Sequence, residues 1–454
     1  MLEIFDCCLK AKYEYYYDRK WQLLGHVCQR WREIVFASPH RLNLRIRCTQ
    51  RTPVKTGLAI WPAYPITIYS YFGNSTGGSD GNIIAALEHK DRVHSVNLTL
   101  RSFQLGRIAA VMCEPFPLLT DLYIFVSTDG IHVRPGLPVA FLGGCAPRLR
   151  SITLSGVHYQ AIPTFLFSTS DLIKLHLSRI PSTSNISPEA MIACLAVLSR
   201  LEIFSIDFQS PVTPVPLLDQ IPAVTQAVLP ALTTFHFRGS SQYLERLVSR
   251  IDSPQLDRIQ IYFFNWPDDF RAPQISRFID RSLEMLSPPF KRAEVIVSSG
   301  RATFTMYRPG ANTTIQWEVM GSHVSRMLQT LSQVKISAIL SNVIHLKLEV
   351  SPGRGRQIEG TFDVQWQHFF GQFSNVKTLH VSRKLARHMT PALEDIAGGI
   401  GAEVLPSLDL IWMGGQRAIS LQKFVASRRL SGHRVTVISN LTEFTKRLGS
   451  YVGE

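Results

Sequence analysis

The chain has 454 residues, of which 45% are hydrophobic and 18% are charged, a balance that excludes an intrinsically disordered protein. The formal net charge is +14, but Lys and Arg are scattered without a run of five, so a solvated basic surface is the first interpretation. An acidic partner is the second, and nucleic acid is not expected because no RNA-binding signature is present.

The first residues contain apolar side chains at helical spacing. Leu2, Ile4 and Phe5 stand at the start, ahead of a tyrosine-rich polar stretch. Between Trp21 and Pro39, apolar residues at i, i+3, i+4 and i+7 predict one helix that Pro39 ends. Its apolar face comprises Leu24, Val27, Cys28, Trp31, Ile34 and Val35. Cys28, like Cys194 later in the chain, is interpreted as a small core residue.

The next segment contains an enzyme-like motif. A strand at Ile66–Tyr71 and a helix at Ile83–Glu88 flank Gly73–Gly77, which matches Gly-x-Ser-x-Gly. A serine nucleophile in this motif needs a tight turn straight into the helix, whereas Gly78–Gly81 lengthens the loop here. A flexible loop is therefore favoured over a hydrolase that uses Ser75, and no catalytic residue is predicted.

From residue 93 onward one motif recurs: an apolar residue, two variable residues, an apolar residue, one variable residue and an apolar residue. Its copies start at Val93, Leu119, Leu149, Leu172, Leu201, Leu232, Leu256, Val343, Val376 and Leu408. Each copy alternates like a strand and cannot bury its apolar trio alone. Stacked copies would form a continuous core, so the pattern predicts a solenoid, an architecture that usually binds other molecules.

The segments between the copies support this interpretation. Helix-like spacing is found at Thr164–Ser168, Pro188–Leu198, Gln242–Ile251 and Ala392–Gly399. Ser187 precedes Pro188 as a helix-start residue. Prolines introduce many copies, where they stop the returning helix.

Between Leu256 and Val343 the motif is missing. Three alternating runs, Glu294–Val297, Thr303–Met306 and Thr314–Val319, are separated by turn residues and predict a β-rich insert at about 290–322. The insert is interpreted as a decoration of the repeats, with a separate functional subdomain as the alternative. Residues 414–454 are expected to cap the last repeat with a strand at Val435–Ile438 and a helix at Leu441–Leu448.

Two family resemblances follow from these patterns. Residues 93–413 resemble irregular leucine-rich repeats, without the regular Asn ladder of tidier ones. Residues 1–47 resemble an F-box, whose second half reads Leu-x-x-Val-Cys-(Arg/Gln/Lys)-x-Trp-(Arg/Lys)-x-(Ile/Leu) followed by Pro; Leu24, Val27, Cys28, Trp31 and Ile34 match it. The whole chain is similar to fungal F-box/leucine-rich-repeat proteins. The family's opening Leu-Pro and acidic residue, which help to grip the adaptor, are absent here.

The resemblance implies an α/β protein of four parts: F-box-like helices at 1–47, a linker and cap at 48–92, the solenoid at 93–413 and a C-terminal cap at 414–454. It implies docking on a Skp-type adaptor of a cullin ubiquitin ligase through Leu2, Ile4, Phe5, Leu23, Leu24, Val27 and Trp31, some of which would build the F-box core. The alternative is a repeat scaffold without ligase function, because the F-box is incomplete.

A target protein, acidic or phosphorylated in one interpretation, would bind the concave face of the solenoid. The variable strand positions expected to line that face are Asp121, Tyr123, Ser151, Thr153, Lys174, His176, Ser205, Thr234, His236, Arg258, Gln260, His345, Lys347, Thr378 and His380. A receptor of this kind performs no bond chemistry, and no cofactor is expected.

The remaining features concern the compartment. The seven cysteines are odd in number and include no Cys-x-x-Cys pair, so neither a disulfide framework nor a zinc site is expected. The start of the chain does not resemble a signal peptide, and no run of 18 apolar residues occurs. A cytoplasmic or nuclear location is the consistent expectation.

Overall fold

A computed structural model gives the fold, which is mixed α/β with a large, mostly parallel β-sheet and, among the described residues, twelve α-helices. The chain divides into two compact units, Met1–Gln209 with Pro214–Leu229, and Ser210–Thr213 with Pro230–Glu454. The structure describes residues 2–9, 17–39, 42, 44–50, 54–60, 62–70, 80–127, 136–160, 162–184, 186–210, 226–264, 272–283, 289–298, 301–308, 314–320, 337–351, 366–386, 389, 393, 404–413, 421–430 and 432–438.

The first unit begins with three short helices, α1 (Leu2–Leu9), α2 (Tyr17–Val27) and α3 (Gln29–Ala37). The prediction of one helix through Cys28 was wrong, because Cys28 has an extended backbone (φ −160°, ψ 169°) and separates α2 from α3. Cys28 is exposed and does not belong to the core. The guanidinium Nε of Arg32 donates to the carbonyl of Gly25 at 2.9 Å, which satisfies a carbonyl near the end of α2.

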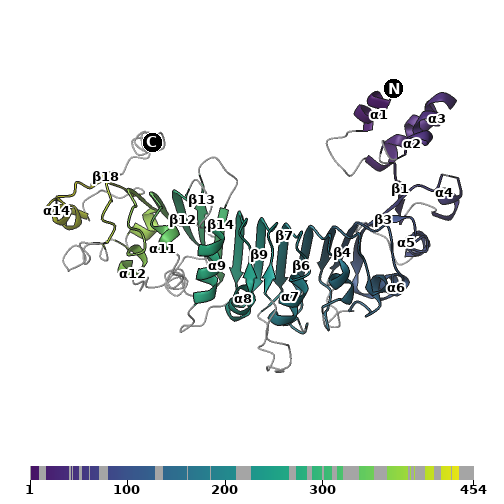
Figure 1. Ribbon diagram of the computed structural model, residues 1–454. Helices are drawn as coiled ribbons and strands as arrows, with labels where there is room; N and C mark the ends of the chain where they lie inside the picture. The colour runs from purple at the N-terminus through teal and green to yellow at the C-terminus, as the bar shows by residue number, and fades with distance from the viewer. Residues whose placement is uncertain are drawn as a thin grey trace. The chain divides into compact units, whose positions relative to one another are not determined.

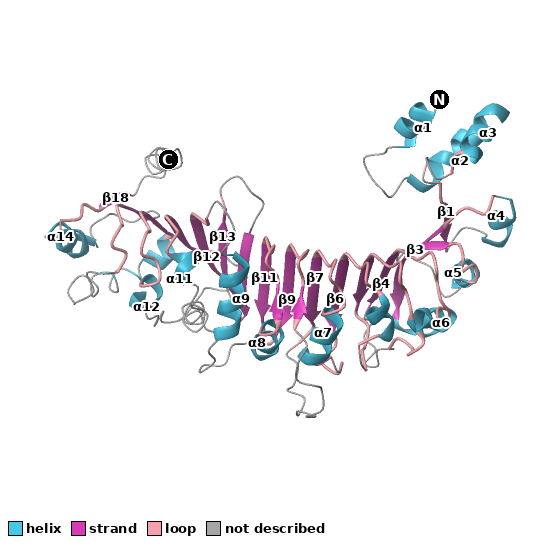
Figure 2. Ribbon diagram, viewed as in Figure 1, coloured by secondary structure: helices cyan, strands magenta, loops and turns pink. Residues whose placement is uncertain are grey.

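Seven parallel strands follow in chain order, each paired with the next (Figure 1). They are β1 (Ile46–Thr49), β2 (Ile66–Ser70), β3 (Val93–Arg101), β4 (Asp121–Ser127), β5 (Ser151–Ser155), β6 (Lys174–Ile180) and β7 (Ile203–Phe208). The connecting elements are α4 (Val54–Ile60), α5 (Asp80–Leu87), α6 (Ser102–Val111), the 3₁₀ helices η2 (Phe141–Gly144) and η3 (Thr164–Ser168), and α7 (Pro188–Leu195); a short strand, β8 (Ala227–Val228), comes later. Figure 2 shows α6 and α7 on one side of these strands.

The recurring motif explains this arrangement. Its middle apolar residues are cross-strand neighbours, in the order Val96, Leu122, Ile152, Leu175 and Phe204. Each is fully buried, and burial of a large apolar side chain contributes roughly 1.5–3 kcal/mol. The stack of apolar trios that the sequence predicts is therefore confirmed in this unit. It begins earlier than predicted, because β1 and β2 pair in parallel ahead of the copy at Val93.

The second unit contains parallel and antiparallel strands in the order β9-β11-β14-β13-β12-β15-β16-β17-β18. Their bounds are β9 (Thr234–Gly239), β11 (Arg258–Phe263), β12 (Arg292–Ser298), β13 (Arg301–Tyr307), β14 (Thr314–Met320), β15 (His345–Val350), β16 (Thr378–Val381), β17 (Leu410–Met413) and β18 (Thr436–Ile438), with a short β10 (Ile251–Asp252). The helices are α8 (Ser241–Val248), α9 (Pro273–Leu283), α11 (Ser337–Leu340), α12 (Trp366–Phe370) and α14 (Gln422–Leu430).

The three predicted runs of the insert form β12, β13 and β14, paired antiparallel with one another. They continue the sheet, because β14 pairs in parallel with β11 and β12 pairs in parallel with β15. Their inward side chains, such as Val295, Phe304 and Trp317, are buried like those of the repeats. The insert thus shares one hydrophobic layer with the repeats on either side.

Three of the four predicted return helices are present. Thr164–Ser168 forms η3, Pro188 opens α7 and Gln242 lies in α8. At α7, the hydroxyl of Ser187 accepts from the amide of Ala190 at 3.1 Å, as expected of a helix-start residue. Ala392–Gly399 lies almost wholly, and Leu441–Leu448 wholly, outside the described residues. None of the described helices has the length and apolar character needed to cross a membrane.

Two glycines give a matched test of this packing. Gly156, which follows β5, has φ +73°, and an added Cβ would lie 2.6 Å from the carbonyl oxygen of Val126. Gly106 lies within α6, and its added Cβ would meet nothing within 4 Å. We expect Gly156→Ala to lower the free energy of unfolding by about 1–3 kcal/mol. Gly106→Ala is expected to raise it by about 0.5–1 kcal/mol. Urea denaturation measures both, and effects of the same sign would contradict this packing.

Candidate functional site

The N-terminal helices expose three large apolar side chains. Ile4 on α1 is 57% exposed, and Leu23 and Val27 on α2 are 68% and 60% exposed. Leu23 and Val27 are four residues apart and share one helix face. We call these three residues the N-terminal apolar surface. Neighbouring exposed apolar side chains, such as those of Leu23 and Val27, are a feature of protein-binding surfaces.

The other predicted adaptor residues have different positions. Phe5 and Leu24 are buried and build the helical core, whereas Leu2 and Trp31 are half-buried. The rings of Phe5 and Trp31 lie 4.9 Å apart and join α1 to α3. The sequence pattern alone could not separate core from surface, because it shows which residues share a helix face and not which face a neighbouring helix covers.

An aromatic cluster fixes these helices to the first strand of the sheet. The indole Nε1 of Trp21 donates to the carbonyl of Arg45 at 2.8 Å, immediately before β1. The Trp21 ring meets the rings of Phe36 and Tyr64 edge-on at 6.4 and 5.6 Å. Trp21 is only 2% exposed, so both its polar and its apolar parts are used in this junction.

The outward side chains of the first unit form polar rows across the sheet. The central row runs through Tyr69, Asn97, Tyr123, Thr153, His176 and Ser205, and the row beside it through Asp121, Ser151 and Lys174. The predicted target-binding positions of this unit therefore lie together on one face. Ser205 is the exception in accessibility, because it is 3% exposed.

The environment of this face in the first unit shifts the pKa of its histidine downwards. Burial lowers the pKa of His176, and the neighbouring Lys174 lowers it further. The guanidinium of Arg179 lies 5.1 Å from the ring centre of Phe125, and that of Arg47 lies 4.7 Å from the ring centre of Tyr69. The face thus presents hydroxyl, amide and aromatic groups with scattered cations.

The second unit has a corresponding polar row. It runs through His236, Gln260, Gln316, Thr305, Glu294, Lys347, His380 and Trp412. The sequence identified the members that belong to motif copies, except Trp412, which also occupies a variable motif position. Gln316, Thr305 and Glu294 belong to the insert and were missed; their alternation with buried residues was the available signal.

Two carboxylates of this face, Glu294 and Glu318, are buried and paired. Glu294 is 8% exposed; Lys347 Nζ lies 2.6 Å from its Oε1, and the hydroxyl of Tyr307 donates to its Oε2 at 3.2 Å. Lys347 also lies 2.5 Å from Glu349. Burial alone lowers the pKa of Lys347, but the hydrogen bonds and charges of both glutamates outweigh burial and raise it.

Glu318 repeats this arrangement two strands away. It is 5% exposed, pairs with Arg301 at 3.0 Å and receives a long hydrogen bond from Thr303 at 3.5 Å. Burial raises its pKa, while Arg301, Thr303 and Arg238 act in the opposite direction. The side chain of Arg301 is 55% exposed and that of Glu318 is 6% exposed, so this pair presents its cation towards solvent.

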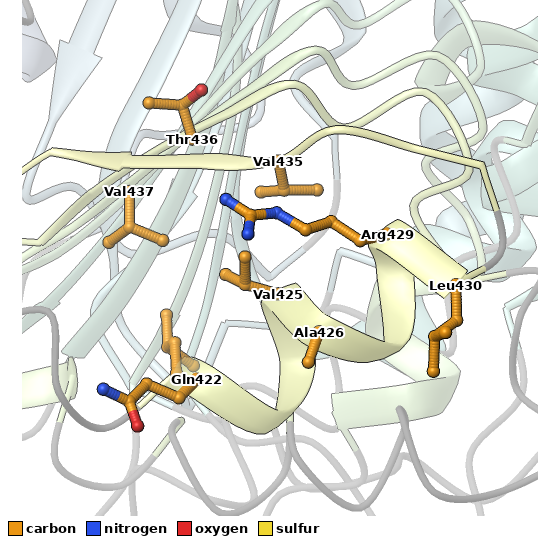
Figure 3. A pocket seen from close by; sticks show the side chains of 9 residues that line it. Gln422, Val425, Ala426, Arg429, Leu430, Val435, Thr436 and Val437 are labelled. Atoms are coloured by element: carbon orange, nitrogen blue, oxygen red, sulfur yellow. The ribbon is translucent and has the colours of Figure 1, made fainter.

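A pocket lies between α14 and β18 (Figure 3). Figure 3 shows Val425 and Arg429 of the helix facing Val435 and Val437. Its lining is largely aliphatic and includes neither a carboxylate nor a histidine. Within the part of the chain that the structure describes, no three His, Cys, Asp or Glu side chains could together hold a metal ion. Ser75 and its motif lie outside the described residues.

No family model matches the sequence, and no curated protein matches it either. The geometry of the described residues therefore provides the grounds for a functional conclusion. That geometry consists of an apolar helical surface at one end of the first unit and polar sheet faces in both units, and both are surfaces suited to binding.

The titration of His380 makes the stability of the second unit depend on pH. Burial lowers its pKa to about 4, with Lys347 next in effect, whereas an ordinary histidine titrates at about 6.5. Because the folded pKa is the lower one, the stability from the neutral ring is complete above about pH 6.5 and is lost as the pH falls towards 4. We expect His380→Gln to reduce the loss of unfolding free energy between about pH 7 and pH 5 by about 1 kcal/mol, allowing for screening of the partly exposed ring.

Urea denaturation at the two pH values measures this effect. His89→Gln is the matched control, because His89 is exposed at the end of α5. An unchanged pH dependence in His380→Gln, or an equal change in the control, would contradict the role of His380.

Proposed function

We propose that the protein is a substrate receptor of a cullin-type ubiquitin ligase. Its N-terminal helices would dock on a Skp-type adaptor, and its stacked repeats, an irregular leucine-rich-repeat solenoid, would bind a target protein. The observation that supports this most is the separation of the F-box-like residues into a buried set and an exposed apolar set, Ile4, Leu23 and Val27. Leu23 and Val27 are exposed side by side on one face of α2, and neighbouring exposed apolar side chains are a feature of protein-binding surfaces.

The sheet supports the target-binding half of the proposal. Parallel strands with buried trios on one side leave the variable positions on the other, where residues distant in sequence form continuous rows. All the predicted target-binding positions are exposed or half-buried except Ser205 and Thr378, which are 3% and 2% exposed. Those two hydroxyls are interpreted as supporting residues.

Within the first unit, the contacts of Trp21 connect the N-terminal helices, which would bind the adaptor, to the sheet, which would bind the target. A receptor increases transfer by raising the effective concentration of target lysines near the loaded enzyme, which depends on the spacing of its two binding surfaces. The hydrogen bond from Trp21 to Arg45 and the packing against Tyr64 hold the apolar surface at a set position relative to β1.

Adaptor binding tests the proposal directly. We expect the chain to bind a purified Skp-type adaptor, and we expect Leu23→Asp and Val27→Asp each to weaken binding about tenfold or more, because a carboxylate would be desolvated in the interface. Isothermal titration calorimetry measures the affinity. Ile60→Asp is the matched control, since Ile60 is 75% exposed on α4, away from this surface.

Each outcome has a distinct meaning. Equal weakening by Ile60→Asp would show that the effect is not local to the N-terminal apolar surface. Failure of the unmodified chain to bind the adaptor would overturn the ligase proposal and leave a repeat scaffold that binds proteins without ligase function.

A further inference from the structure

Basic side chains gather where three neighbouring strands of the second unit begin. Lys291 and Arg292 stand at the start of β12, His345 opens β15 and Lys377 precedes β16. Arg292 is the cross-strand partner of His345, which is the partner of Thr378. The amide of His345 donates to the carbonyl of Lys291 at 3.0 Å. We call Lys291, Arg292, His345 and Lys377 the basic edge.

The cations of the basic edge differ from other cations of the second unit. Among the described residues, Lys291, Arg292 and Lys377 form no ion pair, whereas Lys347, Arg301 and Arg308 each have a carboxylate partner. Arg292 instead lies over the ring of Tyr307, 5.7 Å from its centre. One exposed carboxylate, Asp409, directly precedes β17, the strand beside β16, so three cations stand against one anion at this end of the strands.

His345 responds to this unbalanced charge. Burial lowers its pKa, and Arg292, Lys291 and Lys377 lower it further, with no carboxylate acting in the opposite direction. Two other histidines of the sheet differ in this respect. Asp121 acts to raise the pKa of His94, and Glu349 and Glu294 act to raise the pKa of His380. Nδ1 of His345 lies 2.7 Å from the hydroxyl of Thr378, which fixes the ring against the next strand. The basic edge is therefore a site of positive potential on a rigid support.

We propose that the basic edge binds a carboxylate-rich, extended segment of a partner protein. This inference rests on the proposed target-binding function of the sheet face and deepens it by naming the partner's chemistry. Adjacent strands are about 4.8 Å apart, so the three strands spread their cations over roughly 10 Å, a distance that about three extended residues span. The guanidinium of Arg292 can donate two parallel hydrogen bonds to one carboxylate. The ammonium groups of Lys291 and Lys377 add positive charge on either side of it.

The test uses the full-length chain with a fluorescent oligo-glutamate peptide and an oligo-glutamine peptide of equal length. We expect the glutamate peptide to bind in a salt-dependent manner and the glutamine peptide not to bind. Arg292→Ala and Lys377→Ala should each weaken binding about three- to tenfold, as measured by fluorescence anisotropy. Arg277→Ala, on the exposed side of α9, is the matched control because it removes the same charge away from the basic edge.

A second measurement follows His345 itself. Bound carboxylates should raise its pKa towards the ordinary value, which NMR of labelled histidine detects in the full-length chain. Binding weaker than about 1 mM, or equal weakening by Arg277→Ala, would overturn the inference. A chain that binds the adaptor but not the glutamate peptide would keep the proposed ligase function and lose this site, so the two failures are distinguishable.

Discussion

The structure depends on one constraint: an apolar trio on a short strand is buried only when the neighbouring strands stand in parallel register with it. Leu122, Ile152 and Leu175 illustrate this, because each is fully buried by the equivalent residues of the adjacent copies. The helices and irregular connecting segments then need only cover one side of the sheet and lead the chain to its next strand. Polar rows on the other side are a consequence of the same register.

This constraint explains why much of the fold could be predicted from the sequence. The motif copies, the start of α7 after Ser187 and the three strands of the insert were all visible as periodicity or turn chemistry. The break at Cys28 was not, because Leu24 to Val35 fits the spacing of a single helix and this spacing does not reveal the extended backbone of Cys28. The place of the insert within the sheet was also hidden, since strand alternation does not specify a partner.

The candidate surfaces were predictable to a similar extent. Positions such as Tyr123, His176 and Lys347 follow from the motif, whereas Glu294 and Glu318 belong to the insert, where the motif is missing and strand alternation is the available signal. Exposure could not be inferred from residue type either. Phe5 and Ile4 are adjacent and equally apolar, yet Phe5 packs on Trp31 and Ile4 faces solvent, because successive side chains of a helix point in different directions.

The insert has a consequence for how the second unit assembles. The strands β1 to β7 each pair with the next strand in the chain, but Gln260 of β11 meets Gln316 of β14 across 56 positions and Glu294 of β12 meets Lys347 of β15 across 53. The chain must complete β12, β13 and β14 before β11, already paired with β9, gains its second neighbour, so ordering cannot propagate smoothly from one copy to the next at this point. The β11–β14 seam is thus where the linear cooperativity of a repeat protein is interrupted, and where the strands before and after it become separate folding segments.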